Sequence, residues 1–498
     1  MAKYIMGIDQ GTTGTTVIIF DRDANIISSS YSEFTQYFPQ DGWVEHDAME
    51  IYEVTKRVCK DALDAGKLTT DNIEAIGITN QRVTTTFWNK NTGVPIRKSI
   101  VWQDRRSLPI CERLLALDKK GIEERTGMVI IPNASATKIA WLLENDPEVR
   151  AGVDKGELLF GTIDTWLIWK LSGGAAHVTD LSNATGTLML NAYSLDYDDF
   201  ILNELKIPRE ILPELRSSSE VYAHTDPKEF FGASIPIAGI AGDQQAATFG
   251  QACVKPGMAK NTYGTGAFLL FNCGNTYIPS KRSMMAPVLW KLNDGSVSYG
   301  FEGLIDVSGA AIQWLRDGLG IIEKSSDSEK LAREVENSGG VYFVPAFVGL
   351  GAPHFDSYAR GTMFGITRST TKQHLCRAAL ESMAYQVRDA FNMIESDVGR
   401  PLNTLRVDGG GAKNDLMLQF QADILGIPVE RPVVSETTVL GAAYLAGLAV
   451  GYWTSLDDIS SNWRIDKRFE PQMPEDKREE LYDGWKNAVK RSGGWLKK

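Results

Sequence analysis

Residues 5–20 read IMGIDQGTTGTTVIIF, and this stretch sets the interpretation of the whole chain. The apolar runs at 5–8 and 17–20 are typical of buried strands, and the Gly/Thr segment between them is typical of a tight turn. Asp9 at the end of the first run can hold Mg2+ or its water, and the glycines let backbone amides approach phosphate oxygens. The stretch indicates a phosphate-binding hairpin, and the alternative is an ordinary turn between two strands.

The composition favours a cytoplasmic protein with more than one domain. A chain of 498 residues is about three times the usual domain length, and we expect two domains, 1–250 and 251–498. A net charge of -11 argues against nucleic acid or an anionic membrane as a bulk partner. The five cysteines show no CxxC spacing, which indicates reduced thiols. The chain leaves no room for a signal peptide before its first strand, and the apolar run at 439–453 is too short to span a bilayer.

The order of the remaining segments predicts an α/β protein whose helices cover its sheets. Expected strands at 75–79, 87–89, 99–101 and 405–408 alternate with expected helices at 48–64, 135–144, 305–316, 371–393 and 415–425. The strand, turn and strand at 4–20 resemble the region 236–271, which contains YGTG at 263–266. This likeness indicates a duplicated architecture that grips a nucleotide from two sides.

Two glycine-containing turns are candidates for further nucleotide contacts. Three glycines at 409–411 follow a strand and precede Asn414, which opens a helix, so the backbone there can pass close to a ligand. The alternative is a plain turn with an asparagine cap. Thr265, between two glycines after the strand at 259–262, would form the facing phosphate loop.

Asp243 is the candidate catalytic residue. It follows an apolar strand and precedes Gln244, Gln245 and a small-residue helix. It can act as a general base that accepts a hydroxyl proton during phosphoryl transfer, with the two glutamines orienting substrate hydroxyls. The alternative is an aspartate that only caps a helix.

Polar residues after two other strands indicate a pocket for a polyhydroxyl compound. Arg82 follows the strand ending at Thr79 and can donate several hydrogen bonds, while Trp102 offers an apolar wall. Arg105 and Arg106 are interpreted as surface ion pairs. The five histidines show no ligand spacing and are interpreted as structural.

With these residues assembled, the chain resembles the FGGY family of carbohydrate kinases, and within it the branch that phosphorylates glycerol. The strings that carry the resemblance run from end to end: DQGTTG at 9–14, ITNQR at 78–82, IVWQDRR at 100–106, AGDQQAA at 241–247, YGTG at 263–266 and VDGGGAKNDLMLQF at 407–420. The resemblance implies two actin-like (ribonuclease-H-like) domains with mixed sheets flanked by helices and an ATP cleft between them. It implies ATP-dependent phosphorylation of a terminal hydroxyl of glycerol or a related small polyol, in a homodimer or homotetramer.

The resemblance also assigns roles to individual residues. It implies ATP and Mg2+ as cofactors, Asp243 as the catalytic base, and Asp9 and Asp243 near the metal. The residues implied to contact the nucleotide are Thr12, Thr13, Gly14, Thr265, Gly309, Gln313, Gly410 and Asn414. Those implied around the polyol are Arg82, Val83, Trp102, Asn133, Asp243, Gln244 and Phe268.

Two positions depart from the pattern of the glycerol-phosphorylating branch. Val83 stands where that branch has a glutamate, and Asn133 stands where it has a tyrosine. Losing a carboxylate and a phenol removes hydrogen-bond partners of the substrate and enlarges the pocket. The alternative substrate is therefore a polyol or keto-polyol of four or five carbons. A non-catalytic actin-fold ATPase is an alternative from another class, which would not need the hydroxyl-binding residues.

Overall fold

The computed structural model describes residues 2–496, which form two compact units. The first unit comprises the chain up to Val254 together with Cys273–Gly300 and Thr437–Asn462. The second comprises Lys255–Asn272, Phe301–Glu436 and the chain from Trp463 onward. The units are built from interleaved segments, and the division into 1–250 and 251–498 stays a prediction.

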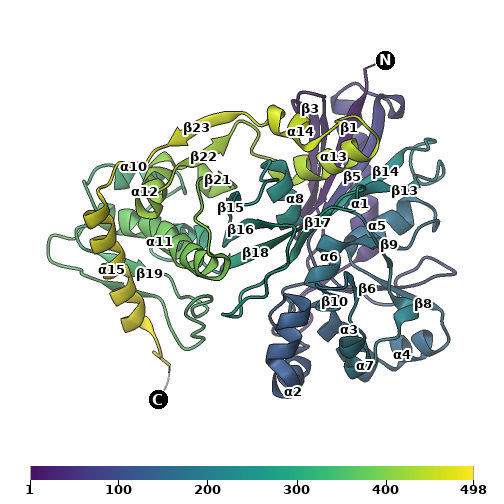
Figure 1. Ribbon diagram of the computed structural model, residues 1–498, viewed down its shortest axis with the longest axis horizontal. Coiled ribbons are helices and arrows are strands. Elements are labelled where there is room, and N and C mark those ends of the chain that lie inside the picture. The colour runs from purple at the N-terminus through teal and green to yellow at the C-terminus, as the bar shows by residue number, and fades with distance from the viewer. Residues whose placement is uncertain (1, 497–498) are drawn as a thin grey trace. The chain divides into compact units, whose positions relative to one another are not determined.

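The sheet of the first unit has six strands in the order β13-β14-β5-β1-β2-β3 (Figure 1). The expected N-terminal hairpin is present as an antiparallel pair at its centre, and two further central strands run parallel to its first strand. The strands are β1 (Tyr4–Gln10), β2 (Gly14–Phe20), β3 (Ile26–Glu33), β5 (Ile73–Asn80), β13 (Ser219–His224) and β14 (Pro236–Gly242).

The second large sheet, with seven strands, repeats this arrangement. Its order is β17-β18-β16-β15-β21-β22-β23, in which an antiparallel hairpin again lies beside two parallel strands. The strands are β15 (Ala259–Tyr263), β16 (Ala267–Gly274), β17 (Val288–Lys291), β18 (Val297–Ile305), β21 (Leu405–Asp408), β22 (Val429–Pro432) and β23 (Ile465–Phe469). The counterpart of the N-terminal hairpin is therefore β15–β16 alone, because residues 236–242 belong to the first sheet.

Short strands form two-stranded ladders outside these sheets. They are β4 (Glu45–His46) with β7 (Ser99–Ile100), β6 (Thr86–Asn89) with β8 (Leu158–Gly161), β9 (Val178–Asp180) with β12 (Glu214–Arg216), β10 (Leu190–Asn191) with β11 (Asp196–Tyr197), and β19 (Tyr342–Val344) with β20 (Thr362–Phe364).

Several helices begin at a residue whose side chain caps the first turn. Asp47 accepts hydrogen bonds from the amides of Met49 and Glu50 at the start of α1, and Asn414 accepts one from Met417 in α12. The helices of the first unit are α1 (Ala48–Ala65), α2 (Leu108–Thr126), α3 (Ser135–Asn145), α4 (Pro147–Asp154), α5 (Ile163–Leu171), α6 (Leu181–Gly186), α7 (Asp199–Leu205), α8 (Asp243–Gly250), α13 (Thr437–Ala449) and α14 (Leu456–Asn462). Those of the second are α9 (Gly309–Asp317), α10 (Asp327–Ala332), α11 (Lys372–Val398), α12 (Asp415–Leu425) and α15 (Glu475–Ser492).

One expected helix starts later than predicted. The helix expected from residue 305 begins at Gly309, because Ile305 is still the last residue of β18 and Ser308 has non-helical dihedral angles. Between residues 2 and 496, no helix combines the length and the apolar character needed to cross a membrane.

Helix α13 lies against one face of the first sheet at van der Waals distance from its backbone. A Cβ atom added at Gly77 in β5 would lie 2.0 Å from the carbonyl oxygen of Ala442, and one added at Gly239 would lie 2.4 Å from the amide of Ala446. The same helix meets α8, where a Cβ at Gly250 would lie 1.9 Å from the carbonyl oxygen of Thr437. Met6, like other alternate residues of the strands, packs on the opposite face in a core shared with α1.

Replacing Gly77 by alanine should destabilise the protein by about 3 kcal/mol or more, because the new methyl group meets backbone atoms that cannot rotate away. Chemical denaturation followed by tryptophan fluorescence measures the change. Gly410→Ala is the matched control, since a Cβ atom there meets no atom within 4 Å. Equal stability of the two variants would contradict the close approach of α13.

Candidate active site

The N-terminal hairpin turns tightly at its Gly/Thr segment. The amide of Gly11 donates to the carbonyl oxygen of Gly14 at 2.9 Å, which closes the turn over Thr12 and Thr13. Gly14 is buried, and a Cβ atom there would lie 2.6 Å from the ring of Tyr31 in β3. Gly14 is thus required for packing against the next strand, while Thr12 and Thr13 form the accessible part of the turn.

Trp102 contacts this turn directly. Its indole Nε1 donates a 2.9 Å hydrogen bond to Oγ1 of Thr12. Because this oxygen accepts from the indole, the hydroxyl hydrogen of Thr12 is available to point toward a ligand oxygen. The residue predicted to line the polyol pocket is therefore joined to the residue predicted to meet the phosphates.

The strand register places two carboxylates at the same end of the parallel strands of the first sheet. Asp9 in β1 is paired with Thr79 in β5, which is paired with Ala241 in β14. Asp243, the first residue of α8, follows two residues after Ala241 and so lies at the same end of the sheet as Asp9. Two strand spacings separate β1 from β14, about 10 Å.

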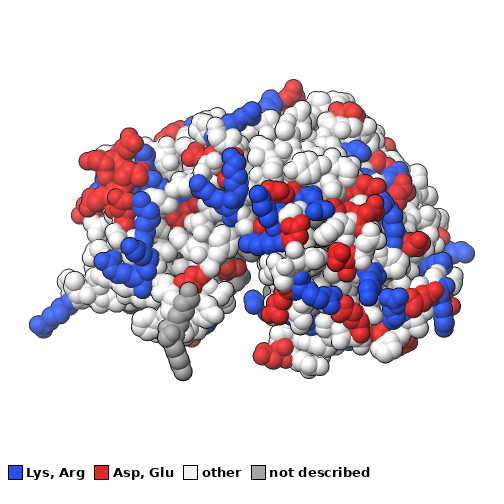
Figure 2. Space-filling view, turned by 60° about the horizontal axis from the view of Figure 1, so that its bottom comes forward, with Lys and Arg blue, Asp and Glu red and all other residues white. Residues whose placement is uncertain are grey.

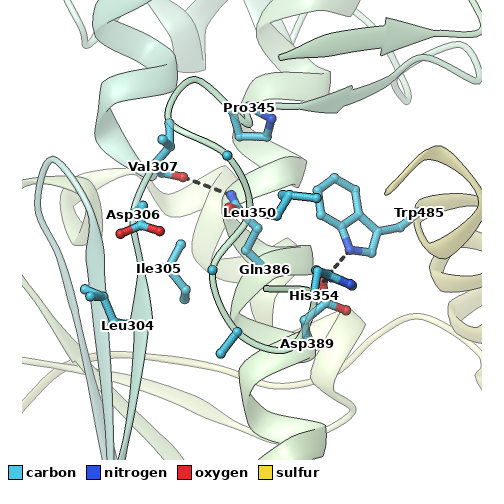
Figure 3. A pocket seen from close by; sticks show the side chains of 13 residues that line it. Leu304, Ile305, Asp306, Val307, Pro345, Leu350, His354, Gln386, Asp389 and Trp485 are labelled. Atoms are coloured by element: carbon cyan, nitrogen blue, oxygen red, sulfur yellow. Dashed lines mark hydrogen bonds and ion pairs between the residues drawn. The ribbon is translucent and has the colours of Figure 1, made fainter. Parts of the chain in front are cut away.

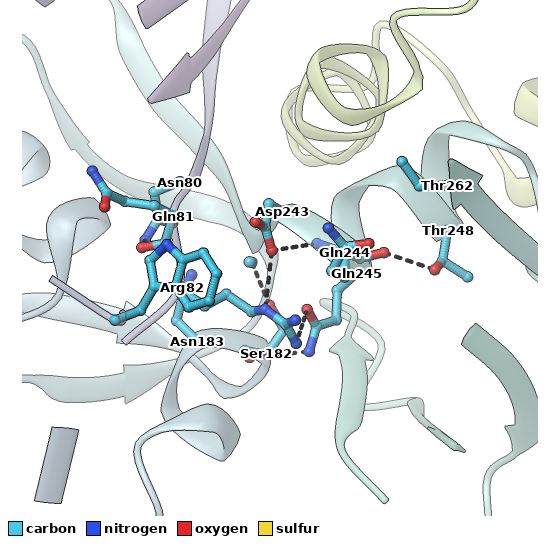
Figure 4. Close-up of polar contacts among 12 residues, drawn as sticks. Asn80, Gln81, Arg82, Ser182, Asn183, Asp243, Gln244, Gln245, Thr248 and Thr262 are labelled. Atoms are coloured by element: carbon cyan, nitrogen blue, oxygen red, sulfur yellow. Dashed lines mark hydrogen bonds and ion pairs between the residues drawn. The ribbon is translucent and has the colours of Figure 1, made fainter. Parts of the chain in front are cut away.

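Arg82, which follows β5, and Asp243, which follows β14, form an ion pair at the ends of these two strands (Figure 4). The guanidinium Nε of Arg82 lies 3.0 Å from Oδ1 of Asp243, which also accepts from the amide of Gln244 at 2.7 Å. A second guanidinium nitrogen lies 3.4 Å from Oε1 of Gln245. The pair is partly exposed, so a hydroxyl compound can reach it, and the charge of Asp243 is balanced without a metal.

The two glutamines after Asp243 have different surroundings. The side-chain amide of Gln245 donates to the carbonyl oxygens of Ser182 and Val288 while its oxygen accepts from Arg82. Gln245 therefore orients Arg82. The sequence analysis had suggested that both glutamines orient substrate hydroxyls. Gln244 stays the predicted substrate contact.

A buried polar cluster lies beside the strand end that precedes Asp243. The sequence analysis assigned it no role. Asp180 caps α6 by accepting from the amides of Ser182 and Asn183, and it accepts from the hydroxyl of Ser218 at 2.6 Å. Ser182 Oγ in turn accepts from the amide of Gly242 at 2.9 Å, one residue before Asp243. Burial raises the pKa of Asp180 above its usual value. The cluster fixes the backbone that carries the candidate base.

Val83 and Asn133 are the two departures from the family pattern. The backbone carbonyls of both accept hydrogen bonds from side chains of α3. Val83 has φ of 58°, an unusual conformation for a β-branched residue, and its carbonyl accepts from the hydroxyl of Ser135 at 2.9 Å. The backbone carbonyl of Asn133 accepts from the ammonium group of Lys138, which is fully buried. Burial lowers the pKa of Lys138 from 10.5 to about 7, against an opposing attraction from Asp104.

Arg106 is buried, so its interpretation as a surface residue was wrong. Its guanidinium lies 2.7 Å from Asp104 and 2.8 Å from Glu45, and it stacks over Trp43 at 3.6 Å from the ring centroid. Both partners outside the local segment come from residues 43–45, about sixty positions earlier. Because the partners lie so far away along the chain, local sequence gave no sign that Arg106 pairs with them.

In the second unit, five predicted nucleotide contacts line one cavity. The cavity has a volume of about 410 Å³, within the range typical of ligand sites. Its apolar floor is formed by Ile312, Leu380, Met383 and Met417. The predicted residues that line it are Thr265, Gly309, Gln313, Gly410 and Asn414.

The glycines of this cavity have identifiable roles. Gly409 has φ of 82°, and a Cβ there would lie 2.6 Å from the carbonyl of Tyr263. A Cβ at Gly309 would lie 2.5 Å from the carbonyl of Gly264, whereas none of the described atoms lies within 4 Å of one at Gly410. Gly410 therefore presents open backbone to the cavity. Phe268, predicted at the polyol, lies on β16 in this second unit, opposite Thr262.

The available carboxylates fit a magnesium ion that is held mainly by phosphates. Mg2+ in phosphoryl-transfer sites takes one or two protein carboxylates and completes its shell with substrate oxygens and water. Asp9 and Asp243 supply that number at one end of the parallel strands. Across the described residues, no group of three or more His, Cys, Asp or Glu side chains could hold a metal on its own.

A second cavity in the second unit is too small for a metabolite (Figure 3). Its volume of about 20 Å³ holds roughly one water molecule. Buried Asp389 accepts from the indole of Trp485 at 2.8 Å and from the hydroxyl of Tyr482 at 2.5 Å, and it pairs with His354 at 3.2 Å. These bonds join the loop containing His354 to α11 and α15, in agreement with a structural histidine.

The charged side chains of the surface are mixed. Figure 2 shows lysine and arginine side chains lying among aspartate and glutamate side chains over most of the face drawn. Many form exposed ion pairs, such as Arg113 with Glu144 at 2.7 Å. Exposed pairs of this kind contribute little to stability, and their main effect is on solubility.

Comparison with known proteins accounts for both units. Residues 4–250 match the N-terminal domain of the FGGY family of carbohydrate kinases, and residues 259–450 match its C-terminal domain. Glycerol kinase 2 of Thermotoga maritima is 55% identical over 500 residues, which cover 100% of each chain. Glycerol kinase of Geobacillus kaustophilus is 55% identical over 494 residues, 98% of this chain and 99% of that protein.

Solved structures agree with these sequence relatives. The crystal structure of Plasmodium falciparum glycerol kinase with ADP is 36% identical and has a TM-score of 0.93, covering 99% of this chain and 98% of that chain. Xylulose kinase from Lactobacillus acidophilus has a TM-score of 0.88 at 24% identity, covering 99% of each chain, and this likeness concerns the fold alone. The predicted α/β fold with two actin-like domains is confirmed.

Lys138 should make stability depend on pH in an unusual range. Its folded-state pKa of about 7 lies below the ordinary 10.5, so between these values the unfolded chain holds a proton that the folded chain lacks. The free energy of unfolding of the wild-type protein should therefore increase relative to that of Lys138→Met as the pH rises from 7 to 10. The increase over these three pH units should be on the order of 4 kcal/mol. Denaturant titrations at each pH measure the difference.

Lys120→Met is the control for this titration, because Lys120 is highly exposed. Its stability relative to the wild type should stay constant over the same pH range. A constant difference for Lys138→Met as well would show that the buried ammonium group keeps its ordinary pKa.

Proposed function

Because this chain belongs to the FGGY family of carbohydrate kinases, we propose that it transfers the terminal phosphoryl group of ATP to a terminal hydroxyl of glycerol, giving ADP and glycerol 3-phosphate. The observation that carries the proposal is 55% identity, over essentially the full length, to several curated glycerol kinases. The site agrees with it, since a carboxylate, a guanidinium and an indole lie around the ends of neighbouring strands of one unit.

In the proposed mechanism Asp243 accepts the proton of the attacking hydroxyl. Its Oδ1 is held by Arg82 and by the amide of Gln244, which fixes the direction in which the carboxylate faces. Arg82 also donates to substrate hydroxyls, and Trp102, with Gln244, Val83, Asn133 and Phe268, completes the proposed acceptor site. Positioning and electrostatic stabilisation supply most of the catalysis in phosphoryl transfer, so this fixed geometry matters more than covalent chemistry.

We assign the phosphate donor to two groups of residues. Thr12 and Thr13 would meet the terminal phosphates, with Gly14 holding the turn against β3, and the cavity of the second unit would hold the adenosine. The residues assigned to the cavity side are Thr265, Gly309, Gln313, Gly410 and Asn414. Asp9 and Asp243 would hold Mg2+, which would supply the positive charge that neutralises the phosphates.

The alternatives from the sequence analysis receive no support from the relatives described. None of the curated relatives named above is a kinase of longer polyols, and the Arg82–Asp243 pair has no purpose in a non-catalytic ATPase. A cytoplasmic location and a homodimer or homotetramer remain part of the proposal.

The substrate is tested by coupled ADP release with a panel of polyols. We expect glycerol to saturate the enzyme and to give a phosphomonoester identified by mass spectrometry, with four- and five-carbon polyols turned over at least about a hundredfold less efficiently in kcat/KM. Higher efficiency with a longer polyol would replace glycerol by that substrate. Equal ATP hydrolysis without any polyol would favour the ATPase.

The catalytic base is tested by Asp243→Asn. The amide keeps the shape of the side chain but cannot accept a proton, so kcat should fall by about a thousandfold or more while ATP affinity, measured calorimetrically, stays within about threefold. Asp294→Asn, in an exposed turn, is the control and should retain wild-type kcat. Activity of Asp243→Asn within about tenfold of wild type would remove Asp243 as the base.

A further inference from the structure

A chain of buried and partly buried hydrogen bonds leads from the end of β5 to the phosphate-binding turn. The side-chain amide of Gln81 lies 3.3 Å from Nδ1 of His46, and Nε2 of His46 lies 2.7 Å from Oε1 of Gln36. The amide of Gln36 then donates to the carbonyl oxygen of Thr12 at 3.0 Å. Gln81 also donates to the carbonyl oxygen of Gly11 at 3.2 Å, so both ends of the chain lie on the turn.

We propose that His46 and Gln36 are positioning residues that set the conformation of the turn at Gly11–Thr13 for the phosphates of the nucleotide. The inference rests on the proposed function, because it needs the turn to bind phosphate. It assigns a role to two residues that touch neither the nucleotide nor the acceptor in the proposal above.

The partners of the two ring nitrogens define the tautomer of His46. The carbonyl oxygens of Gly11 and Thr12 can only accept, so each glutamine must turn its NH2 group toward the turn. The two amide hydrogens of Gln81 are shared among the carbonyl oxygen of Gly11, Oε1 of Gln10 and Nδ1 of His46, so Nδ1 faces a donor and is unprotonated. Nε2 of His46 carries the hydrogen and donates to Oε1 of Gln36. The neutral Nε2–H tautomer of His46 is therefore the form that connects the two glutamines.

The surroundings of His46 keep it in this form. Its side chain is fully buried and lies edge-on to the ring of Phe34, with centroids 5.0 Å apart. Burial lowers the pKa of His46 from 6.5 to about 4, so the ring is neutral at physiological pH. The residue is fixed in place by β4, whose pairing sets His46 opposite Ser99 in β7.

Further hydrogen bonds hold the side chain of Gln81 in its orientation toward the turn. Its Oε1 accepts from the hydroxyl of Thr84 at 2.9 Å, and its amide also donates to Oε1 of Gln10 at 3.0 Å. Gln36 is the partly exposed member, and its removal leaves the carbonyl of Thr12 without this donor. Gln36 is therefore the position at which the turn can be loosened with the least damage to the core.

The first experiment compares Gln36→Met with Gln40→Met in the full-length enzyme. Methionine keeps the length of the side chain but has no donor for Thr12, while Gln40 is exposed in the same segment. We expect Gln36→Met to raise KM for ATP by about fivefold or more, with KM for glycerol within about twofold of wild type. Gln40→Met should leave both constants unchanged. A role in stability alone would lower the melting temperature and leave KM for ATP within about twofold, which would overturn the inference.

The second experiment asks whether the hydrogen-bonding pattern of His46 matters rather than its volume. The side chain in His46→Gln can both accept and donate, whereas that in His46→Leu can do neither. We expect His46→Gln to restore most of the ATP affinity that His46→Leu loses. Equal loss in two folded variants would contradict the positioning role, and if neither folds, the Gln36 comparison decides.

A readout without substrate separates this inference from the proposed function. Amide hydrogen exchange at residues 11–14 should be faster in Gln36→Met than in the wild type and in Gln40→Met. If the wild type shows no glycerol-dependent ADP release, the proposed function fails while the exchange result still reports on the turn. Unchanged exchange in Gln36→Met would overturn the inference even in an active kinase.

Discussion

The close contact between helix α13 and the glycines of β5 and β14 is the constraint on which the first unit depends. At Gly77 and Gly239 the helix backbone lies where any larger side chain would place its Cβ atom, so the strands and the helix have one relative position. The same helix meets α8 at Gly250, and α8 begins at the candidate base. A contact far from any reacting group therefore determines where Asp243 stands relative to the strand ends.

The chemistry at the strand ends depends on a second condition, that the polar groups beneath them are paired. A buried polar group without a partner costs more than a hydrogen bond gains, so such clusters have few arrangements. Asp180 and Ser182 fix the backbone before Asp243, and the glutamines around His46 fix the turn at Thr12. None of these supporting residues would be recognised as functional from its type and place in the sequence alone.

The sequence analysis succeeded where a function is encoded in contiguous residues. The hairpin around Asp9, the glycines at 409–411 and the Asp243 helix start were predicted because local geometry follows from local sequence. It failed where partners are distant along the chain. Arg106 was assigned to the surface because nothing nearby in sequence indicated Glu45 and Trp43, and the start of α9 was misplaced because β18 extends to Ile305 through its pairing in the sheet.

The amino-acid sequence by itself determined the family, the order of strands and helices, and the residue types available for phosphate and hydroxyl groups, since these depend on composition and short-range spacing. The tertiary structure alone decided which of those residues meet. The five predicted residues that line the second unit's cavity come from three separate segments, and the register of three strands brings Asp9 and Asp243 to the same end of the first sheet. Register and sheet order follow from burial and backbone pairing across the whole unit, which no local pattern specifies.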